Sequence, residues 1–467
     1  MKVMRSSIWR LWVLGCMLGT FESASAQGVA DPLLHQGLNQ TVWPGARVRA
    51  MGGVVAGAYQ DVTALFADPA ALSGLRQPEI RIGGSYGTTS LEQEVRWIPN
   101  RIYAELSLVL ENDPDKLVIT RPFDSIRPPW HYRYSAARPT VIAVGVPFSA
   151  RGMSWGVGIG LGQLAVLDHY YQNNNALDPN IGQLRPAPIP RVQEGDSLLV
   201  DWFQFMRERT GALYGVTPAI SVQFGRFAFG LSVTVLTGTS EDWQYRRDRG
   251  QFVLRYNNDF SLRPPSQGEE MLAGSSKYRG VRTVLSGRFA SDRFALGIVV
   301  RPGYTLERRW KTTEGVAREG VDKLQIPLQV TLGLVLYPTN AWRLAVDYDL
   351  HQLDKVQYVP SGGASFTPWV GKSTLRLGVE FRVNDWLALR AGYRDEPQGF
   401  VPAGAAFVND PAMASVYTVG SGVHFGRFGF DFSYELFRLR YDDLWLSNVN
   451  TNRIVAHTVL LEASYRL

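Results

Sequence analysis

The chain has 467 residues, of which 45% are hydrophobic, 19% charged and 12% aromatic, with 46 glycines and one cysteine. This composition excludes a disordered chain, a disulfide scaffold and a cysteine-based zinc cluster, and no uncharged apolar run after residue 26 is long enough for a transmembrane helix. The 48 basic and 42 acidic residues nearly balance and are scattered, so we expect no nucleic-acid partner.

The N-terminus has the features of an export signal. Three basic residues precede an apolar stretch from Leu11 to Phe21, and Ala24-Ser25-Ala26 provides a small-x-small cleavage site. We therefore predict a signal peptide over residues 1–26 and a mature chain that begins near Gln27.

Residues 27–77 lack the alternation of a strand and are dense in small side chains, which permit tight packing. Asp61 is placed to cap a short helix through Phe66. The sequence therefore predicts an N-terminal plug over residues 27–77, lying inside a barrel formed by residues 78–467. The residues of the plug motif are Gly45, Arg47, Met51, Gly52, Gly53, Asp61, Asp68, Pro69 and Ala70.

The rest of the chain alternates between apolar and polar residues over long segments, as in residues 342–350, 375–383 and 428–436. A soluble β-sandwich also alternates, but its strands usually run to only about 5–6 residues. Here the segments are longer, and Arg376, Glu380 and Arg382 place charges along one face. The pattern favours an all-β fold, a transmembrane antiparallel β-barrel with a polar interior.

Six very short connections, each flanked by aromatic residues, indicate one rim of this barrel. Strands that start and end at that rim are even in number, so we expect 14, or 16 if residues 78–136 supply three crossings. The predicted strands, besides one or more within 78–136, are 137–148, 153–167, 213–224, 227–240, 277–289, 293–310, 321–337, 341–356, 372–383, 386–395, 413–425, 428–441 and 453–467. Residues 128–131 are predicted to be loop.

The plug segment also resembles a known family. Gly-Ala-Arg at 45–47, Met-Gly-Gly at 51–53 and Asp-Pro-Ala at 68–70 are similar to the plug signature of the FadL-type long-chain fatty acid transporters of the outer membrane. Asp68 stands where that family usually has Asn. The hairpins around 326–344 and 377–393 are similar as well. The resemblance implies a 14-stranded barrel with an N-terminal plug, and type IX secretion outer-membrane components share a similar motif.

The strand predicted at 153–167 places four glycines on its inward face: Gly156, Gly158, Gly160 and Gly162. Glycine leaves space beside the backbone and often marks a bend or a close approach. Packing of the plug there explains the glycines equally well. The family resemblance implies a lateral exit at a kink in the third strand, so we predict an opening near Gly158 and Gly160 with the plug as its gate.

The long connection at 168–212 contains a helical pattern that begins at residues 195–197 and ends at Gly211. We predict a helix whose apolar face forms an external hydrophobic site or packs on neighbouring loops. That face comprises Leu198, Leu199, Trp202, Phe203 and Met206.

Few residues suggest catalysis, metal binding or ligand binding. Of the six histidines, only His424, facing inward beside the strand of Ser433 and Glu435, is a catalytic candidate, and a solvated polar residue of the lumen explains it better. No metal-binding constellation is visible, so we expect no enzyme activity, no metal and no cofactor. Several apolar residues face inward by alternation, and they suit either a path for an amphiphile or packing against the plug. They are Val141, Ala143, Val299, Val335, Ile454 and Leu460.

The expected function is that of a channel in the outer membrane of a Gram-negative-type bacterium. Hydrophobic or amphipathic small molecules would diffuse through it, and long-chain fatty acids are the first candidates. A barrel that docks partners of a protein secretion or surface-attachment system is the alternative. Expected partners are membrane lipids and lipopolysaccharide, because guanidinium groups suit phosphate contacts, although codon bias explains the excess of arginine more simply.

Overall fold

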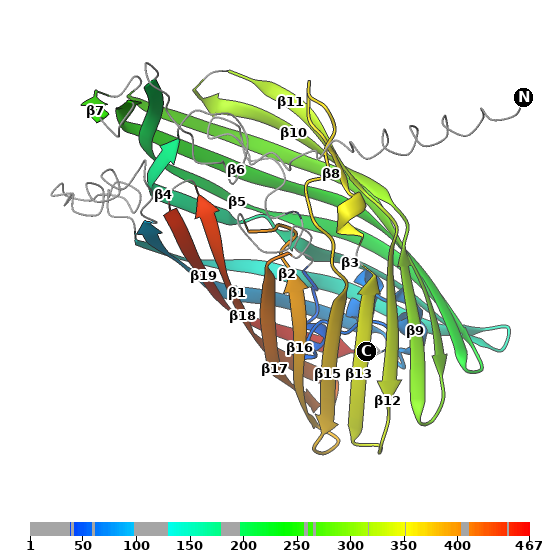
Figure 1. Cartoon of the computed structure of the whole chain (residues 1–467). Coiled ribbons are helices and arrows are strands. Elements are labelled where there is room, and N and C mark those ends of the chain that lie inside the picture. Colours follow the sequence, from blue (N-terminus) through cyan, green and yellow to red (C-terminus); the bar gives the residue numbers. More distant parts are fainter. Residues whose placement is uncertain are drawn as a thin grey trace, which may run out of the picture.

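The computed structural model describes residues 38, 42–57, 61–97, 129–178, 197–255, 260–264, 268–315, 317–350, 352–402, 411–445 and 448–467. The signal peptide predicted at 1–26 lies outside these residues. The described strands form one antiparallel sheet that closes on itself (Figure 1), because β1 (Glu79–Trp97) pairs with both β2 (Trp130–Ala150) and β19 (Asn448–Arg466).

Fourteen strands cross the barrel wall, as predicted. Four crossings consist of two successive strands, and Pro302 and Pro327 lie at two of these interruptions because proline cannot donate a ladder hydrogen bond. The double crossings are β3 (Met153–Val166) with β4 (His169–Asp178), β9 (Phe294–Arg301) with β10 (Tyr304–Glu314), β11 (Glu319–Ile326) with β12 (Gln329–Leu336), and β13 (Trp342–Leu350) with β14 (Gln357–Val359). The single ones are β1, β2, β5 (Ser197–Phe224), β6 (Phe227–Arg255), β8 (Glu269–Ala290), β15 (Thr374–Arg382), β16 (Leu387–Pro397), β17 (Met413–Phe425), β18 (Phe428–Trp445) and β19, and a short β7 (Phe260–Arg263) pairs with β6.

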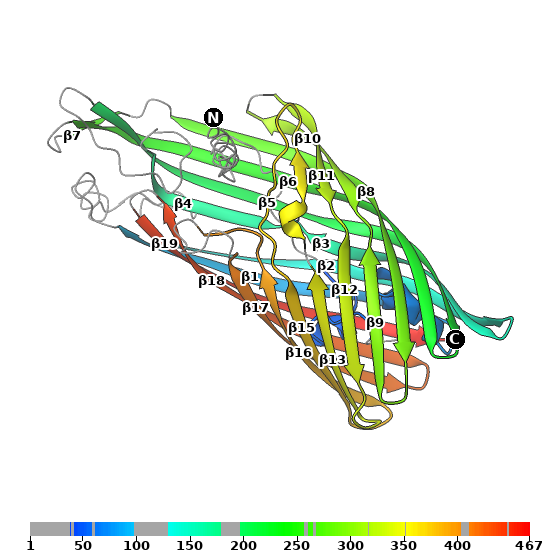
Figure 2. The ribbon, with the colours of Figure 1, turned by 45° about the vertical axis from the view of Figure 1, so that its right-hand side comes forward.

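The six short connections lie together at one end of the barrel, at the lower right of Figure 2, which we call the short-turn end. Aromatic rings flank them on the outer surface: Phe224 packs against Phe227, and Trp386 stacks on Phe425. Longer strands, above all β5 and β6, extend far beyond the others at the opposite end.

The outward faces of the strands form an apolar belt. Phe430 and Leu461 are 52% and 60% exposed, whereas the inward-facing Asp431 and Glu462 are 3% and 4% exposed. This is the reverse of a soluble sandwich, whose apolar faces are buried, and it confirms the transmembrane barrel. Outward tyrosines on several strands, including Tyr86 of β1, Tyr348 of β13 and Tyr417 of β17, form a tyrosine row that marks the belt's upper edge.

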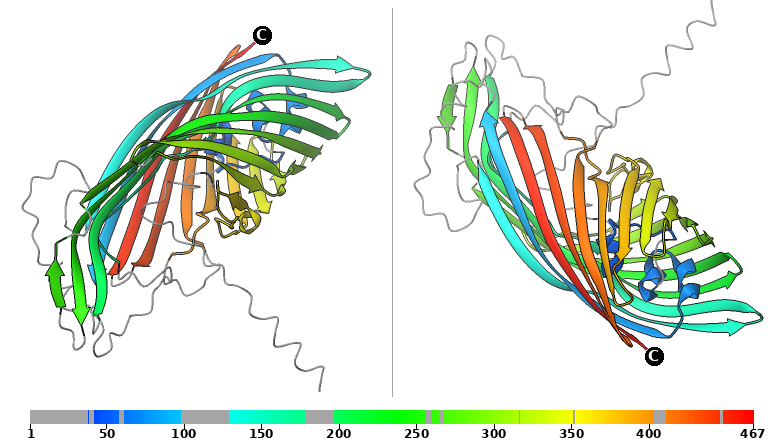
Figure 3. Two further views of the ribbon diagram at one scale, coloured as in Figure 1. Left: turned by 90° about the horizontal axis from the view of Figure 1, so that it is seen from above. Right: turned by 90° about the horizontal axis from the view of Figure 1, so that it is seen from below.

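The plug lies inside the barrel, beside the short-turn end (blue in Figure 3). It contains α1 (Ala46–Ala50) and two 3-10 helices, η1 (Val62–Phe66) and η2 (Pro69–Gly74); a third, η5 (Leu353–Lys355), follows β13. The Asp61 carboxylate accepts a hydrogen bond from the Thr63 N–H at 2.9 Å, so the predicted cap and short helix are confirmed. No helix in the described part of the chain is long and apolar enough to cross a membrane.

Two local predictions are wrong. Trp130 and His131, predicted as loop, begin β2, which is longer at this end than expected. The helix predicted from residue 197 is instead the first part of β5. Every residue from Phe203 to Arg207 is buried, so both faces of the strand are covered there. A strand covered on both faces loses its alternation, and its apolar residues then imitate a helical pattern.

Candidate functional site

Wall side chains hold the plug by hydrogen bonds to its backbone. Asp347 accepts from the N–H groups of Val55 and Ala56 at 2.6 and 3.1 Å, and Glu462 accepts from Ala46 N–H at 2.8 Å. Similar bonds join Gly52 N–H to Thr418 and Ala70 N–H to Ser286. The wall thus satisfies backbone groups that the short plug helices leave unpaired.

An ion-pair network continues this attachment. The Arg47 guanidinium donates to both oxygens of Glu380, at 3.0 and 2.8 Å, and Arg390 links Glu380 to Asp431. Asp68 accepts from Gly57 N–H at 2.9 Å within the plug, and burial raises the pKa of its carboxyl. Arg47 and Asp68, both predicted motif residues, therefore fix the plug; Asp68 is buried, whereas Arg47 also borders a hollow below the plug.

Backbone-to-backbone contact explains the motif glycines. Gly52 and Gly53 have φ of +70° and +83°, and a Cβ on Gly52 would lie 2.5 Å from the Leu377 carbonyl oxygen. Met51 is buried against Gly378 of the wall. Gly45 precedes α1, where a Cβ would meet Thr63 at 2.6 Å, and Pro69 begins η2.

Above the plug, the barrel contains a cavity of about 480 Å³, within the usual range of about 300–1,000 Å³ for ligand pockets. Its floor is formed by Trp43 and Arg49 of the plug, and its walls come from β1 to β4, β16, β18 and β19. Nine of the lining side chains are aromatic: Trp43, Trp130, Tyr134, Tyr170, Tyr171, Trp369, Phe400, Phe437 and Tyr441.

Charged groups lie at the bottom of this cavity. Arg394 is bound by both oxygens of Glu435, at 3.0 and 3.2 Å, and by Glu396 at 2.9 Å. Arg49 donates through Nε to the Trp43 carbonyl oxygen at 3.0 Å and forms no ion pair with a described residue. Burial lowers the pKa of the Arg49 guanidinium, which nevertheless stays protonated. The floor therefore offers a cation to a bound molecule.

Beside this cavity the wall is incompletely paired. The ladder between β2 and β3 runs from Ala150 opposite Met153 to Val141 opposite Gly162. Beyond it, within the described residues, no ladder joins residues 130–140 of β2 to β4, which pairs with β5. We call this gap in the ladder the wall slot. It begins just below the tyrosine row, because Pro139 within the slot lies opposite Gly84 and Ala137 lies opposite Tyr86.

Local irregularities on both strands accompany the slot. Pro139 has no N–H to donate, and β3 has a bulge between Gln163 and Ala165. The Leu164 carbonyl at this bulge accepts a hydrogen bond from Val42 N–H of the plug segment at 3.1 Å. The plug segment thus contacts the edge of the slot.

Side chains close the slot where the backbone does not. Arg138 of β2 donates to both oxygens of Asp168 at 2.8 and 2.7 Å, and Gly211 N–H also binds Asp168. Higher up, Tyr132 stacks on Tyr170 with ring centroids 3.7 Å apart. Side chains can change rotamer without breaking a ladder, so no ladder hydrogen bond holds the slot closed.

Comparison with solved structures identifies the architecture. A FadL homologue of Pseudomonas aeruginosa superposes with a TM-score of 0.58 at 13% identity, covering 91% of this chain and 98% of its own. The chain has the FadL fold. The P. putida toluene transporter TodX (TM-score 0.51, 13% identity, 90% and 97% covered) and the Ralstonia pickettii toluene transporter TbuX (0.51, 12%, 91% and 98%) are also similar. No family model and no curated protein sequence matches the chain.

Within this FadL fold, the four inward glycines of β3 lie against the plug. Both ladders of β3 are continuous through Gly156, Gly158, Gly160 and Gly162. A Cβ on Gly156 would meet the Leu72 carbonyl oxygen at 2.4 Å, and one on Gly162 would meet the Phe66 ring at 2.7 Å. The slot begins just beyond the last of them.

The predicted external hydrophobic residues all belong to β5, where Phe203 and Met206 are buried. Leu198, Leu199 and Trp202 pair through their backbones with β6. Of the apolar inward residues, Val141, Ala143 and Val335 pack in one cluster with the plug, and Val299 packs on Ala56. Ile454 instead lines the cavity, so the two explanations apply to different residues.

Sequence reasoning missed the residues that define the slot. Arg138, Asp168, Tyr132 and Tyr170 carry no motif, and Asp168 was expected in a loop. Pro139 inside a strand pattern was an available signal, because proline is confined to edges and bulges of sheets.

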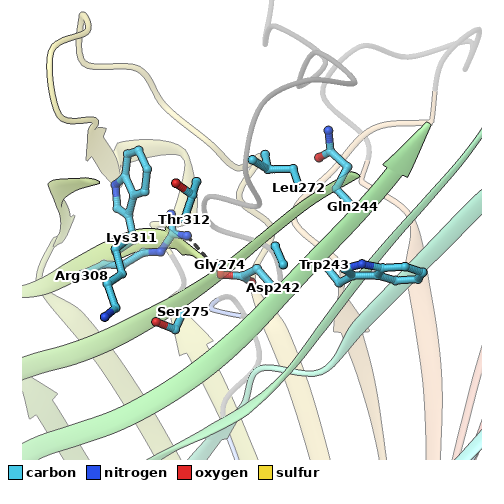
Figure 4. Close-up of a pocket in the computed structure, with 11 residues that line it drawn as sticks. Asp242, Trp243, Gln244, Leu272, Gly274, Ser275, Arg308, Lys311 and Thr312 are labelled. Carbon is cyan, nitrogen blue, oxygen red and sulfur yellow. Dashed lines mark hydrogen bonds and ion pairs between the residues drawn. The ribbon is translucent and has the colours of Figure 1, made fainter. Parts of the chain in front are cut away.

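The structure contains other hollows besides this cavity. One of about 460 Å³ lies below the plug at the short-turn end and is lined by charged residues, including Arg343, Glu380 and Arg382. Another, of about 20 Å³, has room for about one water molecule between β6, β8 and β10 (Figure 4). No group of three potential metal ligands occurs among the residues that the structure describes.

Proposed function

We propose that this protein is an outer-membrane channel through which hydrophobic or amphipathic small molecules diffuse without a cofactor. The aromatic cavity next to an unpaired stretch of wall is the observation that carries the proposal. The apolar belt and the FadL fold support the location, and the short-turn end then faces the periplasm. Membrane lipids, including lipopolysaccharide, are the partners of the outer surface.

The proposed route is sideways. A molecule in the cavity has the plug beneath it, anchored to the wall by buried bonds. The slot between β2 and β4 starts within the apolar belt, just below the tyrosine row. We therefore move the proposed exit from Gly158 and Gly160 to the segment just beyond Gly162, with Arg138, Asp168 and the plug residue Val42 at its margin.

The lining suggests two substrate classes. Long-chain fatty acids remain the first candidate, because their chains would contact the aromatic walls and their carboxylate would meet Arg49. Neutral aromatic hydrocarbons would use only the walls. TodX and TbuX are described as toluene transporters, so toluene is the natural comparison ligand.

Uptake by a deletion strain that carries the gene for the wild type or for the Arg49→Gln variant tests the channel function and the role of Arg49. We expect the variant to take up labelled palmitate about tenfold more slowly, because a charge-assisted hydrogen bond is lost, while toluene uptake is unchanged. Arg49→Lys, which keeps the charge, is the matched control and should restore much of the palmitate rate. Equal uptake of both ligands with and without the gene would rule out the channel.

The alternative, a secretion component that moves no small molecule, predicts a lumen filled by the plug. The cavity above the plug supports transport instead.

A further inference from the structure

Five basic residues share one patch of the outer surface above the apolar belt. They alternate along their strands with buried residues such as Tyr278, Arg308 and Asp322, so their side chains point away from the lumen. We call them the outer basic patch: Lys277 and Arg279 of β8, Arg309 and Lys311 of β10, and Lys323 of β11.

The patch begins where the belt ends. On β8 the outward residues Leu285 and Val281 are 44% and 55% exposed, and the next two outward positions are Arg279 and Lys277. The paired strand β10 continues the patch at the same height, and Figure 4 shows Ser275 of β8 beside Lys311 of β10. In a membrane this is the level of the lipid headgroups on the side opposite the short turns.

The protein balances the charges of the patch only in part. Glu241, Glu307 and Glu319 share the surface, which leaves an excess of two positive charges. Arg309 binds Glu307 at 2.7 Å. No described acidic side chain forms an ion pair with the other four cations.

Two of these cations face each other directly. Lys277 lies opposite Arg309 in the β8–β10 ladder, and like charges in that position destabilise a sheet. The chain contains only seven lysines, and three of them, Lys277, Lys311 and Lys323, are in this patch. An anion between the strands would turn this repulsion into attraction.

We propose that the outer basic patch binds the phosphate groups of an anionic outer-leaflet glycolipid of the lipopolysaccharide type. Lipid anchoring holds the phosphates at the height of the patch, where each cation adds to the attraction. A soluble anion lacks this anchoring and is screened by salt. The inference rests on the proposed outer-membrane location and is independent of the ligand that the channel carries.

The test uses the full mature barrel in detergent and bisphosphorylated lipid A as the probe, with binding measured by native mass spectrometry. The variant Lys277→Gln/Arg309→Gln/Lys323→Gln should bind lipid A weaker by roughly two orders of magnitude. Its matched control, Arg226→Gln/Arg293→Gln/Arg427→Gln, removes three exposed charges at the short-turn end and should bind as wild type does.

Three results would overturn the proposal: unchanged affinity in the patch variant, equal binding of dephosphorylated lipid A, or equal loss in the control variant. Complete displacement by millimolar inorganic phosphate would also overturn it, by showing a site for soluble anions. Palmitate and toluene uptake by the same variants keeps the two proposals separate. A patch variant that loses lipid A binding but keeps wild-type uptake supports the patch alone.

Discussion

The two halves of the barrel differ in how their walls are sealed. Around the plug, the ladders that join β2 to β3 and β6 to β8 are continuous, and wall glycines let backbone approach backbone: a Cβ on Gly230 would lie 2.2 Å from Ala70 N. Around the cavity, one stretch of wall has no ladder, and the ion pair between Arg138 and Asp168 spans it.

The half of the barrel around the plug is closed by ladders, and the half around the cavity contains the proposed exit. Strands joined by a continuous ladder cannot separate without losing many hydrogen bonds at once. Side chains that close a gap can move apart one contact at a time. We therefore expect changes near the plug to affect stability and leakage, and changes near the slot to affect the rate of uptake.

The largest expected effect comes from adding one methyl group where the wall contacts the plug backbone. Gly230→Ala places a Cβ against the backbone of η2, which has no side-chain rotamer to change, so we expect a loss of about 3 kcal/mol in unfolding free energy or displacement of the plug. Urea unfolding in lipid vesicles measures the first outcome, and ion conductance across a planar bilayer measures the second.

Gly87→Ala is the matched control in the other half. Its Cβ would meet nothing closer than Thr458 Oγ1 at 3.4 Å, an ordinary contact. We expect its stability to stay within about 0.5 kcal/mol of wild type. Equal losses in both variants would mean that the two halves are packed alike.

Filling the slot should slow uptake. Ala136 of β2 lines the cavity beside the slot, whereas its neighbour Ala137 faces outward. We expect Ala136→Trp to reduce palmitate uptake about tenfold or more, because the indole would occupy the proposed exit, and Ala137→Trp to leave it unchanged. Similar rates in the two folded variants would exclude an exit at this place.

The smallest effect is expected from releasing the ion pair across the slot. Partly exposed pairs contribute about 0.2–1 kcal/mol, so Arg138→Gln should raise the uptake rate by no more than about fivefold. Arg133→Gln, an outward change on the same strand, serves as the control. A decrease with Arg138→Gln would assign Arg138 to ligand binding and not to closure.

Most of the barrel could be predicted because the environment of each strand's two faces is recorded in that strand's own sequence. Outward residues such as Phe430 and Leu377 meet lipid and inward ones such as Asp431 meet polar neighbours, so each strand carries its own alternation. Residues 203–207 broke that rule because neighbours covered both faces, a fact that the strand's own sequence does not contain.

The plug was predictable from its motif, but the slot was not. Gly52 and Asp61 serve needs that are visible in sequence, a positive φ and a helix cap. The slot depends on the absence of a ladder between two strands, and each strand alternates normally beside it. Tyr132 and Tyr134 precede the predicted strand 137–148, and only tertiary pairing reveals the missing partner.

The attachment of the plug also has a consequence for the order of assembly. The groups that bind the plug backbone, Ser286, Asp347, Thr418 and Glu462, come from strands made long after the plug itself. Helices as short as α1 and η1 do not persist alone in water. The N-terminal segment is therefore synthesised before every strand of the wall but acquires its structure after them, once β19 has joined β1.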